Sequence, residues 1–127
     1  MDLPPPENAE LTQSGYEFYP EALEHTIRYA SRMTGVPVLV TENGVAAEND
    51  ERRIEYIKRA IAGVQRCRED RVDVRGYFYW SLLDNFEWVS GYGPKFGLVS
   101  VNRETQARTI KPSAAMYGAL ARKTRMS

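Results

Sequence analysis

Hydrophobic residues recur along this chain at two different spacings, and each spacing predicts a different kind of element. Two short runs rich in β-branched and aromatic residues, 36–41 and 74–81, predict strands. The first run is apolar almost without interruption, which is the pattern expected of a strand covered on both faces. Apolar residues at helical spacing predict three amphipathic helices, at 20–33, 50–67 and 113–123. The resulting order is helix, strand, helix, strand, helix. Because a helix lies between the two strands, we expect the strands to be parallel, as in α/β folds.

The first predicted strand ends on a carboxylate, within the sequence Thr-Glu-Asn-Gly at 41–44. In parallel sheets and barrels, ligands bind at the carboxyl ends of the strands, so Glu42 is a candidate catalytic residue. Asn43 and Gly44 both tolerate positive φ, which predicts a sharp turn after the strand. The alternative interpretation is a polar strand end that leads into an ordinary loop.

A long segment that combines aromatic and acidic residues follows the second predicted strand. Trp80 and Trp88 offer flat apolar faces, and Asp84 and Glu87 offer hydrogen-bond acceptors. A sugar ring needs both, because its C–H face stacks on an indole and its hydroxyl groups need fixed polar partners. The alternative is that the aromatic residues belong to the core, which we expect for residues 77–79. A buried glutamate costs several kcal/mol without a partner, so Glu87 predicts a ligand or an arginine beside it.

Two motifs in these segments resemble those of the family 1 glycoside hydrolases, which include β-glucosidases. They are T-E-N-G and Y-W-S-L-x-D-N-F-E-W, and the resemblance extends over nearly the whole chain. The resemblance implies that Glu42 is the catalytic nucleophile. It also implies that Trp80 stacks beneath the sugar, that Glu87 binds O4 and O6, and that Trp88 donates its indole N–H to O3. Phe96 is then expected beside the O6 pocket, and Trp88 implies a neutral sugar rather than a 6-phosphorylated one.

The resemblance implies an α/β fold that forms the carboxyl-terminal part of a (β/α)₈ TIM barrel, about the last two βα units plus the preceding helix. A complete barrel takes about 250 residues. Two strands alone also leave both sheet edges unpaired. We therefore expect residues 1–127 to form a partial TIM barrel that is incomplete without an amino-terminal segment or self-association.

A retaining β-glycosidase needs a second carboxyl group roughly 5 Å from the nucleophile, acting as acid and base. The resemblance places it in an Asn-Glu-Pro motif, which does not occur in these 127 residues. We therefore expect this chain to hydrolyse β-glucosides or related small sugars only with an acid/base supplied by another segment, and to be inactive alone. A non-catalytic sugar-binding fragment and a self-associating barrel fragment remain alternatives. The sequence does not distinguish glucose from galactose or fucose.

Charge and rare residue types narrow the functional classes. Lys and Arg together number 17, as do Asp and Glu, so neither nucleic acid nor a membrane surface is an expected partner. With Cys67 as the single cysteine and His25 as the single histidine, we expect no metal site, no cofactor and a cytoplasmic location. The arginines at 52–53 and 66–71 are interleaved with acids, which predicts solvated helix faces. Glu42 should be surrounded by hydrogen-bond donors that keep it ionised.

Overall fold

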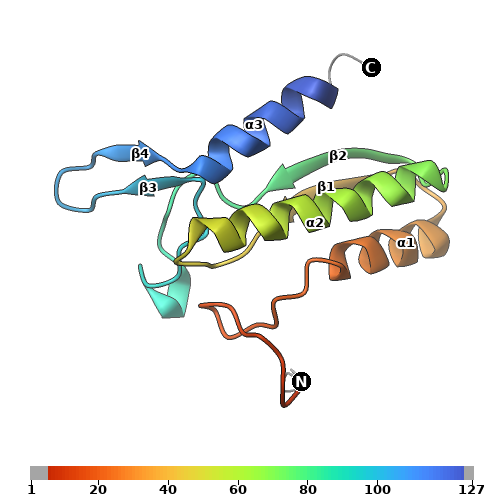
Figure 1. The fold of residues 1–127 in the computed structure, drawn as a ribbon. Helices are drawn as coiled ribbons and strands as arrows, with labels where there is room; N and C mark the ends of the chain where they lie inside the picture. Colours follow the sequence, from red (N-terminus) through yellow and green to blue (C-terminus); the bar gives the residue numbers. More distant parts are fainter. Residues whose placement is uncertain (1–5, 125–127) are drawn as a thin grey trace.

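The computed structural model describes residues 6–124, and its centre is a pair of parallel strands backed by helices (Figure 1). Helices α1 and α2 run side by side against one face of this two-stranded sheet, and a small antiparallel hairpin and a last helix follow. In chain order the elements are α1 (Ala22–Thr34), β1 (Val38–Asn43), α2 (Asp50–Glu69), β2 (Val74–Tyr79), a short 3₁₀ helix (Trp88–Ser90), β3 (Val99–Val101), β4 (Arg108–Ile110) and α3 (Pro112–Thr124).

The predicted order of three helices and two parallel strands is confirmed, with boundaries that move by about two residues. One shift matters for function, because β1 runs to Asn43 and Glu42 therefore lies inside the strand rather than after it. The β3–β4 hairpin was not predicted. Its strands have three residues each, too few to show a pattern of alternation, and the pairing of Val99 with Ile110 joins residues eleven positions apart.

Local signals explain where the helices begin and end. The side chain of Asn49 accepts a hydrogen bond from the Glu51 backbone N–H at 2.8 Å and so satisfies a free donor at the start of α2. Helix α1 ends at Gly35, which has a φ of 66° and donates its N–H to the Ser31 carbonyl at 2.8 Å. A left-handed residue at this position favours glycine.

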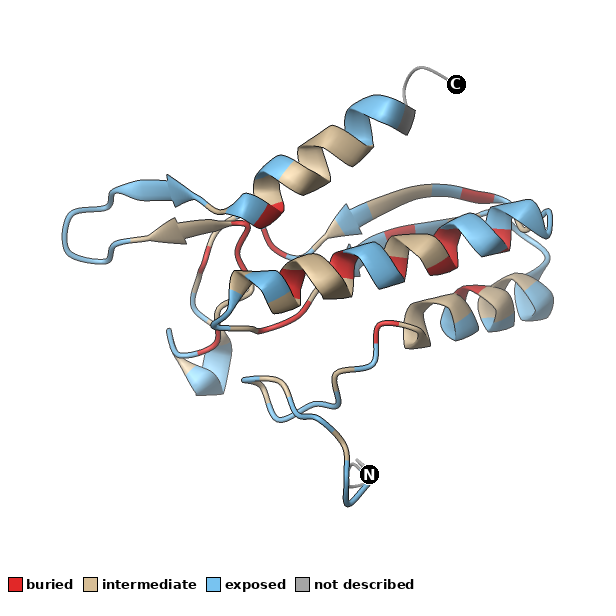
Figure 2. Cartoon of the chain, in the orientation of Figure 1, coloured by how far each residue is buried: buried red, intermediate tan, exposed pale blue. Residues whose placement is uncertain are grey.

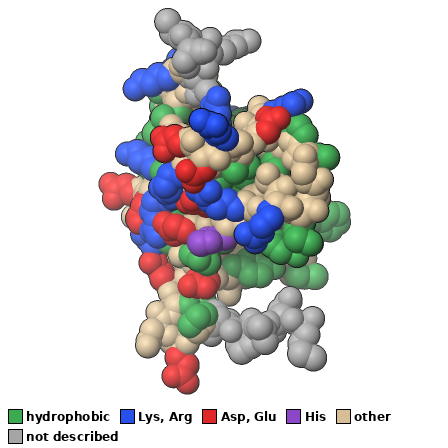
Figure 3. Space-filling model, turned by 90° about the vertical axis from the view of Figure 1, so that its right-hand side faces the viewer, with side chains coloured by type: hydrophobic (Ala, Val, Ile, Leu, Met, Phe, Trp, Pro, Cys, Tyr) green, Lys and Arg blue, Asp and Glu red, His purple; other side chains and the backbone are tan. Residues whose placement is uncertain are grey.

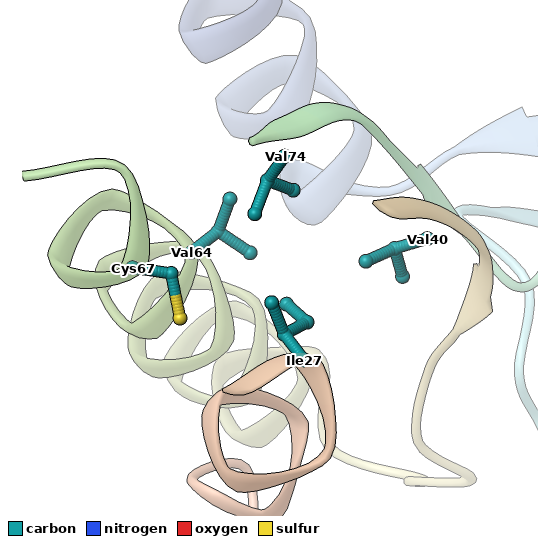
Figure 4. Close-up of a cluster of buried hydrophobic side chains, with 5 residues drawn as sticks. All are labelled: Ile27, Val40, Val64, Cys67 and Val74. Carbon is teal, nitrogen blue, oxygen red and sulfur yellow. The ribbon is translucent and has the colours of Figure 1, made fainter. Parts of the chain in front are cut away.

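The core lies between the helices and one face of the sheet. Figure 4 shows five side chains from both helices and both strands converging there: Ile27, Val40, Val64, Cys67 and Val74. Burying each large apolar side chain contributes about 1.5–3 kcal/mol. The buried residues of α2 recur along the helix as a stripe (Figure 2), and Val64 and Cys67 of this stripe belong to the core cluster.

The other face of the sheet is exposed, which corrects two expectations. Leu39 and Phe78 point to this face, and Phe78 is 56% exposed. The expectation that residues 77–79 are all core is therefore wrong for Phe78, whereas Tyr77 packs against the core cluster. The expectation that the first strand is covered on both faces is also wrong in this chain, because the helices cover only one.

Charged side chains of both signs gather on the outer face of the helices (Figure 3). Glu24 of α1 binds Arg28 at 2.7 Å and Arg66 of α2 at 2.6 Å, so ion pairs join the two helices at their surface. The prediction of solvated arginines is confirmed for Arg66 and wrong for Arg53, which is 1% exposed. None of the helices in the described part of the chain is long and apolar enough to span a membrane.

Candidate active site

The carboxyl ends of β1 and β2 meet at one edge of the sheet. Asn43 pairs with Tyr79, and the Trp80 backbone N–H donates to the Asn43 carbonyl at 2.9 Å. Trp80 is the donor of this hydrogen bond, and Glu42 is the residue immediately before its acceptor, Asn43. The two residues that the sequence singled out, 38 positions apart, are thus brought to the same edge.

A bulge in β1 determines the direction of Glu42. Val40 pairs with Tyr77 and Asn43 pairs with Tyr79, so two residues of β1, Thr41 and Glu42, lie opposite the single residue Phe78. Such a bulge re-aims side chains that simple alternation would place on the other face. Both Thr41 and Glu42 are consequently exposed.

Asn43 turns back toward the helices. Its Oδ1 accepts a hydrogen bond from the Tyr77 hydroxyl at 3.0 Å, and its Nδ2 donates to the Tyr56 hydroxyl at 3.2 Å. Burial raises the pKa of both tyrosines, which therefore stay protonated and keep these hydrogen bonds. Asn43 fixes the end of the strand, and Glu42 is left on the open face.

The glycine of the motif is required for a reason that differs from the predicted one. Neither Asn43 nor Gly44 has a positive φ, and no turn follows the strand, so the predicted sharp turn is wrong. Instead the backbone passes very close to Trp80. A Cβ atom on Gly44 would lie 1.8 Å from the Trp80 carbonyl oxygen, so only glycine allows the two loops to approach.

Glu42 is exposed, and no residue among 6–124 donates a hydrogen bond to its carboxylate. The expectation of surrounding donors is therefore wrong within this part of the chain. Among the same residues, no group of three or more His, Cys, Asp or Glu side chains could hold a metal ion.

The loop that carries the predicted sugar contacts is folded tightly on itself. The Glu87 N–H donates to the Gly91 carbonyl at 2.7 Å, and the Ser90 N–H donates to the Glu87 carbonyl at 3.0 Å. Trp88 is 82% exposed and Trp80 is partly exposed, so both indoles can meet a ligand.

The Glu87 carboxyl group lies in a poorly solvated position. Its Oε1 atom is buried without a hydrogen-bond partner in the described structure. Burial raises the pKa of Glu87, the neighbouring Asp84 carboxylate adds to the rise, and a hydrogen bond from Trp80 opposes it. Among residues 6–124 no arginine pairs with Glu87, and the ligand interpretation of this residue remains.

Phe96 is half-buried and held through its backbone. Its carbonyl accepts hydrogen bonds from the Tyr79 hydroxyl at 3.0 Å and from the Ser81 N–H at 3.4 Å. Burial raises the pKa of Tyr79 to about 12, so the hydroxyl keeps its proton for this contact.

Asp84 was predicted as an acceptor for sugar hydroxyls, and the structure corrects this. The side chain is buried and accepts hydrogen bonds from the Gly97 N–H at 2.8 Å and from Lys111 Nζ at 3.0 Å. Burial lowers the pKa of the Lys111 ammonium group and the hydrogen bond to Asp84 opposes this. Asp84 is therefore occupied inside the protein, and Glu87 is the acidic residue of this loop that retains a free acceptor.

Arg53 holds the loops behind the site, and sequence reasoning missed it. It forms an ion pair with Asp50, and its Nη2 donates to the carbonyls of Ala47 and Lys95, the latter at 2.6 Å. Asp50 in turn accepts two hydrogen bonds from Ser113 at the start of α3, both at 2.7 Å. The signal was available, since Arg53 lies four residues before Ile57 on the buried stripe of α2.

A groove away from the strand ends that carry Glu42 and Trp80 is not part of this site. It has a volume of about 650 Å³ and lies between α2, α3 and the amino-terminal half of β2, at the end of the strand away from Trp80. Tyr117 of α3 lines it and donates its hydroxyl to the Tyr77 carbonyl at 3.0 Å.

Comparison with known proteins identifies the class to which this arrangement belongs. The chain superimposes on a β-glucosidase named 1317 with a TM-score of 0.93 and 59% identity, covering 96% of this chain and 30% of the other. It matches a β-glycosidase from Pyrococcus horikoshii with a TM-score of 0.85 and 43% identity, over 96% of this chain and 28% of the other. These neighbours are α/β-barrel glycosidases, so the fold is that of part of such a barrel.

The sequence comparisons give the family. The model of glycosyl hydrolase family 1 matches residues 5–126. A bifunctional β-D-glucosidase/β-D-fucosidase of Bifidobacterium breve is 41% identical over 120 residues, which is 84% of this chain and 26% of the relative. β-Glucosidase A of Acetivibrio thermocellus is 38% identical over 121 residues, which is 87% of this chain and 27% of the relative. The chain belongs to glycosyl hydrolase family 1 and spans about a quarter of the length of these two curated relatives.

Proposed function

We propose that this chain is the carboxyl-terminal segment of the catalytic domain of a retaining β-glycosidase that acts on β-glucosides or related neutral sugars. The observation that carries the proposal is the meeting of Glu42 and Trp80 at the carboxyl edge of two parallel strands, linked by the hydrogen bond from the Trp80 N–H to the Asn43 carbonyl at 2.9 Å. An exposed carboxylate beside an exposed indole provides a nucleophile next to a surface on which a sugar ring can stack.

The chemistry needs two carboxyl groups, and Glu42 supplies one. An oxygen of its carboxylate attacks the anomeric carbon and forms a C–O bond as the glycosidic bond breaks. The departing oxygen takes a proton from an acid/base group, which then removes a proton from the water that cleaves the glycosyl ester and frees Glu42. Since no Asn-Glu-Pro occurs in these residues, another segment provides the acid/base in this proposal.

The remaining site residues bind the sugar. Trp80 stacks on the ring, and the indole N–H of the exposed Trp88 donates to O3. The unpartnered Oε1 atom of Glu87 accepts hydrogen bonds from O4 and O6, which satisfies a buried acceptor that the protein leaves open. Phe96, held by Tyr79, borders the O6 pocket. The names of the relatives, a β-glucosidase/β-fucosidase and a β-glucosidase, support a β-linked neutral hexose as the substrate.

Complementation tests the assembly. The chain is combined with an amino-terminal segment of a family 1 enzyme that bears Asn-Glu-Pro, and hydrolysis of 4-nitrophenyl β-D-glucoside is followed. We expect turnover by the mixture, none by this chain alone, and a first-formed product of β configuration by NMR. Binding of glucose without turnover would instead favour a non-catalytic sugar-binding fragment.

Replacement of the nucleophile tests the role of Glu42 in that assembled enzyme. Glu42→Ala should reduce hydrolysis by several orders of magnitude, and added azide should restore reaction and yield the α-glycosyl azide, because a small anion can occupy the vacated position. Glu69→Ala, which removes an exposed glutamate at the end of α2, is the matched control and should leave hydrolysis unchanged. A Glu42→Ala enzyme with ordinary activity would exclude this residue as nucleophile.

A further inference from the structure

A half-buried lysine far along the chain closes the base of the loop that carries Glu87 and Trp88. Lys111 lies just before α3, and its Nζ atom bonds to Asp84 at 3.0 Å and to the Gly97 carbonyl at 2.7 Å. Asp84 and Gly97 are the two ends of this loop, which we call the recognition loop (residues 84–97). The Gly97 N–H donates to Asp84 Oδ1 at 2.8 Å, so the two ends also touch directly.

All hydrogen-bonding groups of Asp84 are bound by residues beyond the tip of the loop. Its N–H donates to the Val99 carbonyl at 3.0 Å, and its own carbonyl accepts from Arg103. Its carboxylate is shared between Gly97 and Lys111. The side chain is almost fully buried, so the ion pair with Lys111 is little screened by water. Asp84 is consequently a fixed point from which the rest of the loop extends.

The tip of the recognition loop has no comparable anchor in its backbone. The backbone hydrogen bonds of residues 87–91 join residues of the tip to one another, as in the bonds from Glu87 to Gly91 and from Gly91 to Trp88. Trp88 and Val89 are largely exposed. The loop is also held elsewhere, because Trp80 donates a hydrogen bond to the Glu87 side chain and Arg53 binds the Lys95 carbonyl. The base sets the point from which the tip extends, and there Gly97 fits so closely against the Asp84 backbone that a Cβ would lie 2.2 Å from the Asp84 nitrogen.

We propose that Lys111 is a positioning residue for sugar recognition, because by bridging Asp84 and Gly97 it sets where Glu87 and Trp88 stand relative to Trp80. The inference rests on the proposed function, in which Glu87 binds O4 and O6. Lys111 itself touches no substrate. It lies 24 residues beyond Glu87, in a segment to which the sequence motifs assign no role. Its loss should weaken discrimination between hydroxyl groups more than it weakens the attack by Glu42.

The test compares two substrates in the enzyme assembled from this chain and its complementary segment. The ratio of kcat/KM for 4-nitrophenyl β-D-glucoside to that for its 6-deoxy analogue measures recognition of the O6 hydroxyl. We expect Lys111→Met to lower this ratio roughly tenfold, since a misplacement of about 1 Å costs up to 10²-fold in rate. The loss should fall on the glucoside, Lys111→Arg should restore part of the ratio, and the exposed control Lys58→Met should leave it unchanged.

A purely structural role predicts a different result, namely an equal fall of kcat/KM for both substrates with an unchanged ratio, and that result would overturn the proposal. If Lys111→Met does not fold, the double variant Asp84→Asn/Lys111→Met takes its place, because it removes both charges and leaves no buried ion unpaired. Failure of both variants to fold would identify Lys111 as a folding residue and would also overturn the proposal.

Failure of the proposed function is recognised separately. A wild-type ratio near one, or a wild type without activity, contradicts the role of Glu87 or the enzymatic proposal itself. The positioning role of Lys111 is then judged by amide hydrogen exchange of residues 86–92, which must become faster in Lys111→Met than in Lys58→Met. Equal exchange in the two variants would refute the positioning role of Lys111.

Discussion

Arg53→Met removes the cation that ties the loop after β1 to the recognition loop, and the structure allows its cost to be worked out. Arg53 is 1% exposed, and its loss leaves the carbonyls of Ala47 and Lys95 without these donors and Asp50 without its counter-ion. Breaking a buried ion pair by deleting one partner costs about 3–5 kcal/mol. Asp50 keeps its two hydrogen bonds from Ser113 and its side chain is 19% exposed, so we expect the lower end, about 3 kcal/mol.

The neighbouring arginine provides a matched control. Arg52 is 32% exposed, pairs with Glu10 and Glu55, and lies 3.8 Å from the ring centre of Phe18. Surface ion pairs contribute about 0–1 kcal/mol and an exposed cation–π contact about 0.5–1 kcal/mol. Arg52→Met should therefore lower the free energy of unfolding by about 1 kcal/mol.

Equilibrium unfolding in urea measures both variants against the wild type. Native proteins have a total stability of about 5–15 kcal/mol, so a loss of about 3 kcal/mol is a large part of such a value. Adding Asp50→Asn to Arg53→Met should recover part of the loss, because the unpaired charge is then gone. Equal losses for Arg53→Met and Arg52→Met would refute the reasoning that the buried network, rather than arginine as such, holds these loops.

Two further substitutions test the edge of the sheet and the recognition loop. Gly44→Ala forces a Cβ against the Trp80 carbonyl and should displace Glu42 from Trp80, with a loss in kcat/KM of roughly 100-fold in the assembled enzyme, whereas Gly93→Ala, with 3.4 Å to its nearest neighbour, should cost little. Glu87→Gln should raise the free energy of unfolding at pH 7, because it removes a carboxylate whose pKa is raised by burial. In the wild type, the contribution of Glu87 to stability is fully present below the ordinary glutamate pKa and is lost as the pH rises through the raised pKa. Urea unfolding at pH 7 and at a pH below the ordinary glutamate pKa checks this, and a gain in stability that is larger at the acid pH would contradict it.

Periodicity along the chain was sufficient to predict the order of the main elements and the strand end at which Glu42 lies. Both depend on local patterns, since a strand of six residues and a helix of twenty repeat their spacing often enough to be read. The β3–β4 hairpin offers only three residues on each side, and it therefore left no such pattern.

Most of the features that sequence reasoning missed depend on contacts between distant segments. The bulge at Thr41 and Glu42 exists only relative to Phe78 on the other strand. The burial of Asp84 follows from Lys111, 27 residues later, so a residue that looked like a sugar ligand proved to be the anchor of its loop. Arg53 is the exception, because its place on the buried stripe of α2 could have been recognised from the helical spacing.

The two halves of the candidate site are supported by different kinds of interaction. The position of Glu42 is fixed by the backbone hydrogen bonds between the strands and by the side chain of Asn43. These backbone hydrogen bonds resist small changes because strand pairing is cooperative along its length. The tip that carries Glu87 is set by buried charges at the base of its loop, where one side chain can change the position of several residues. The two halves are joined where the Ala47 N–H donates to the Lys95 carbonyl at 3.1 Å and where Arg53 donates to the carbonyls of both residues. A change at Arg53 should therefore affect both nucleophile and sugar contacts, whereas a change at Lys111 should affect the sugar contacts first.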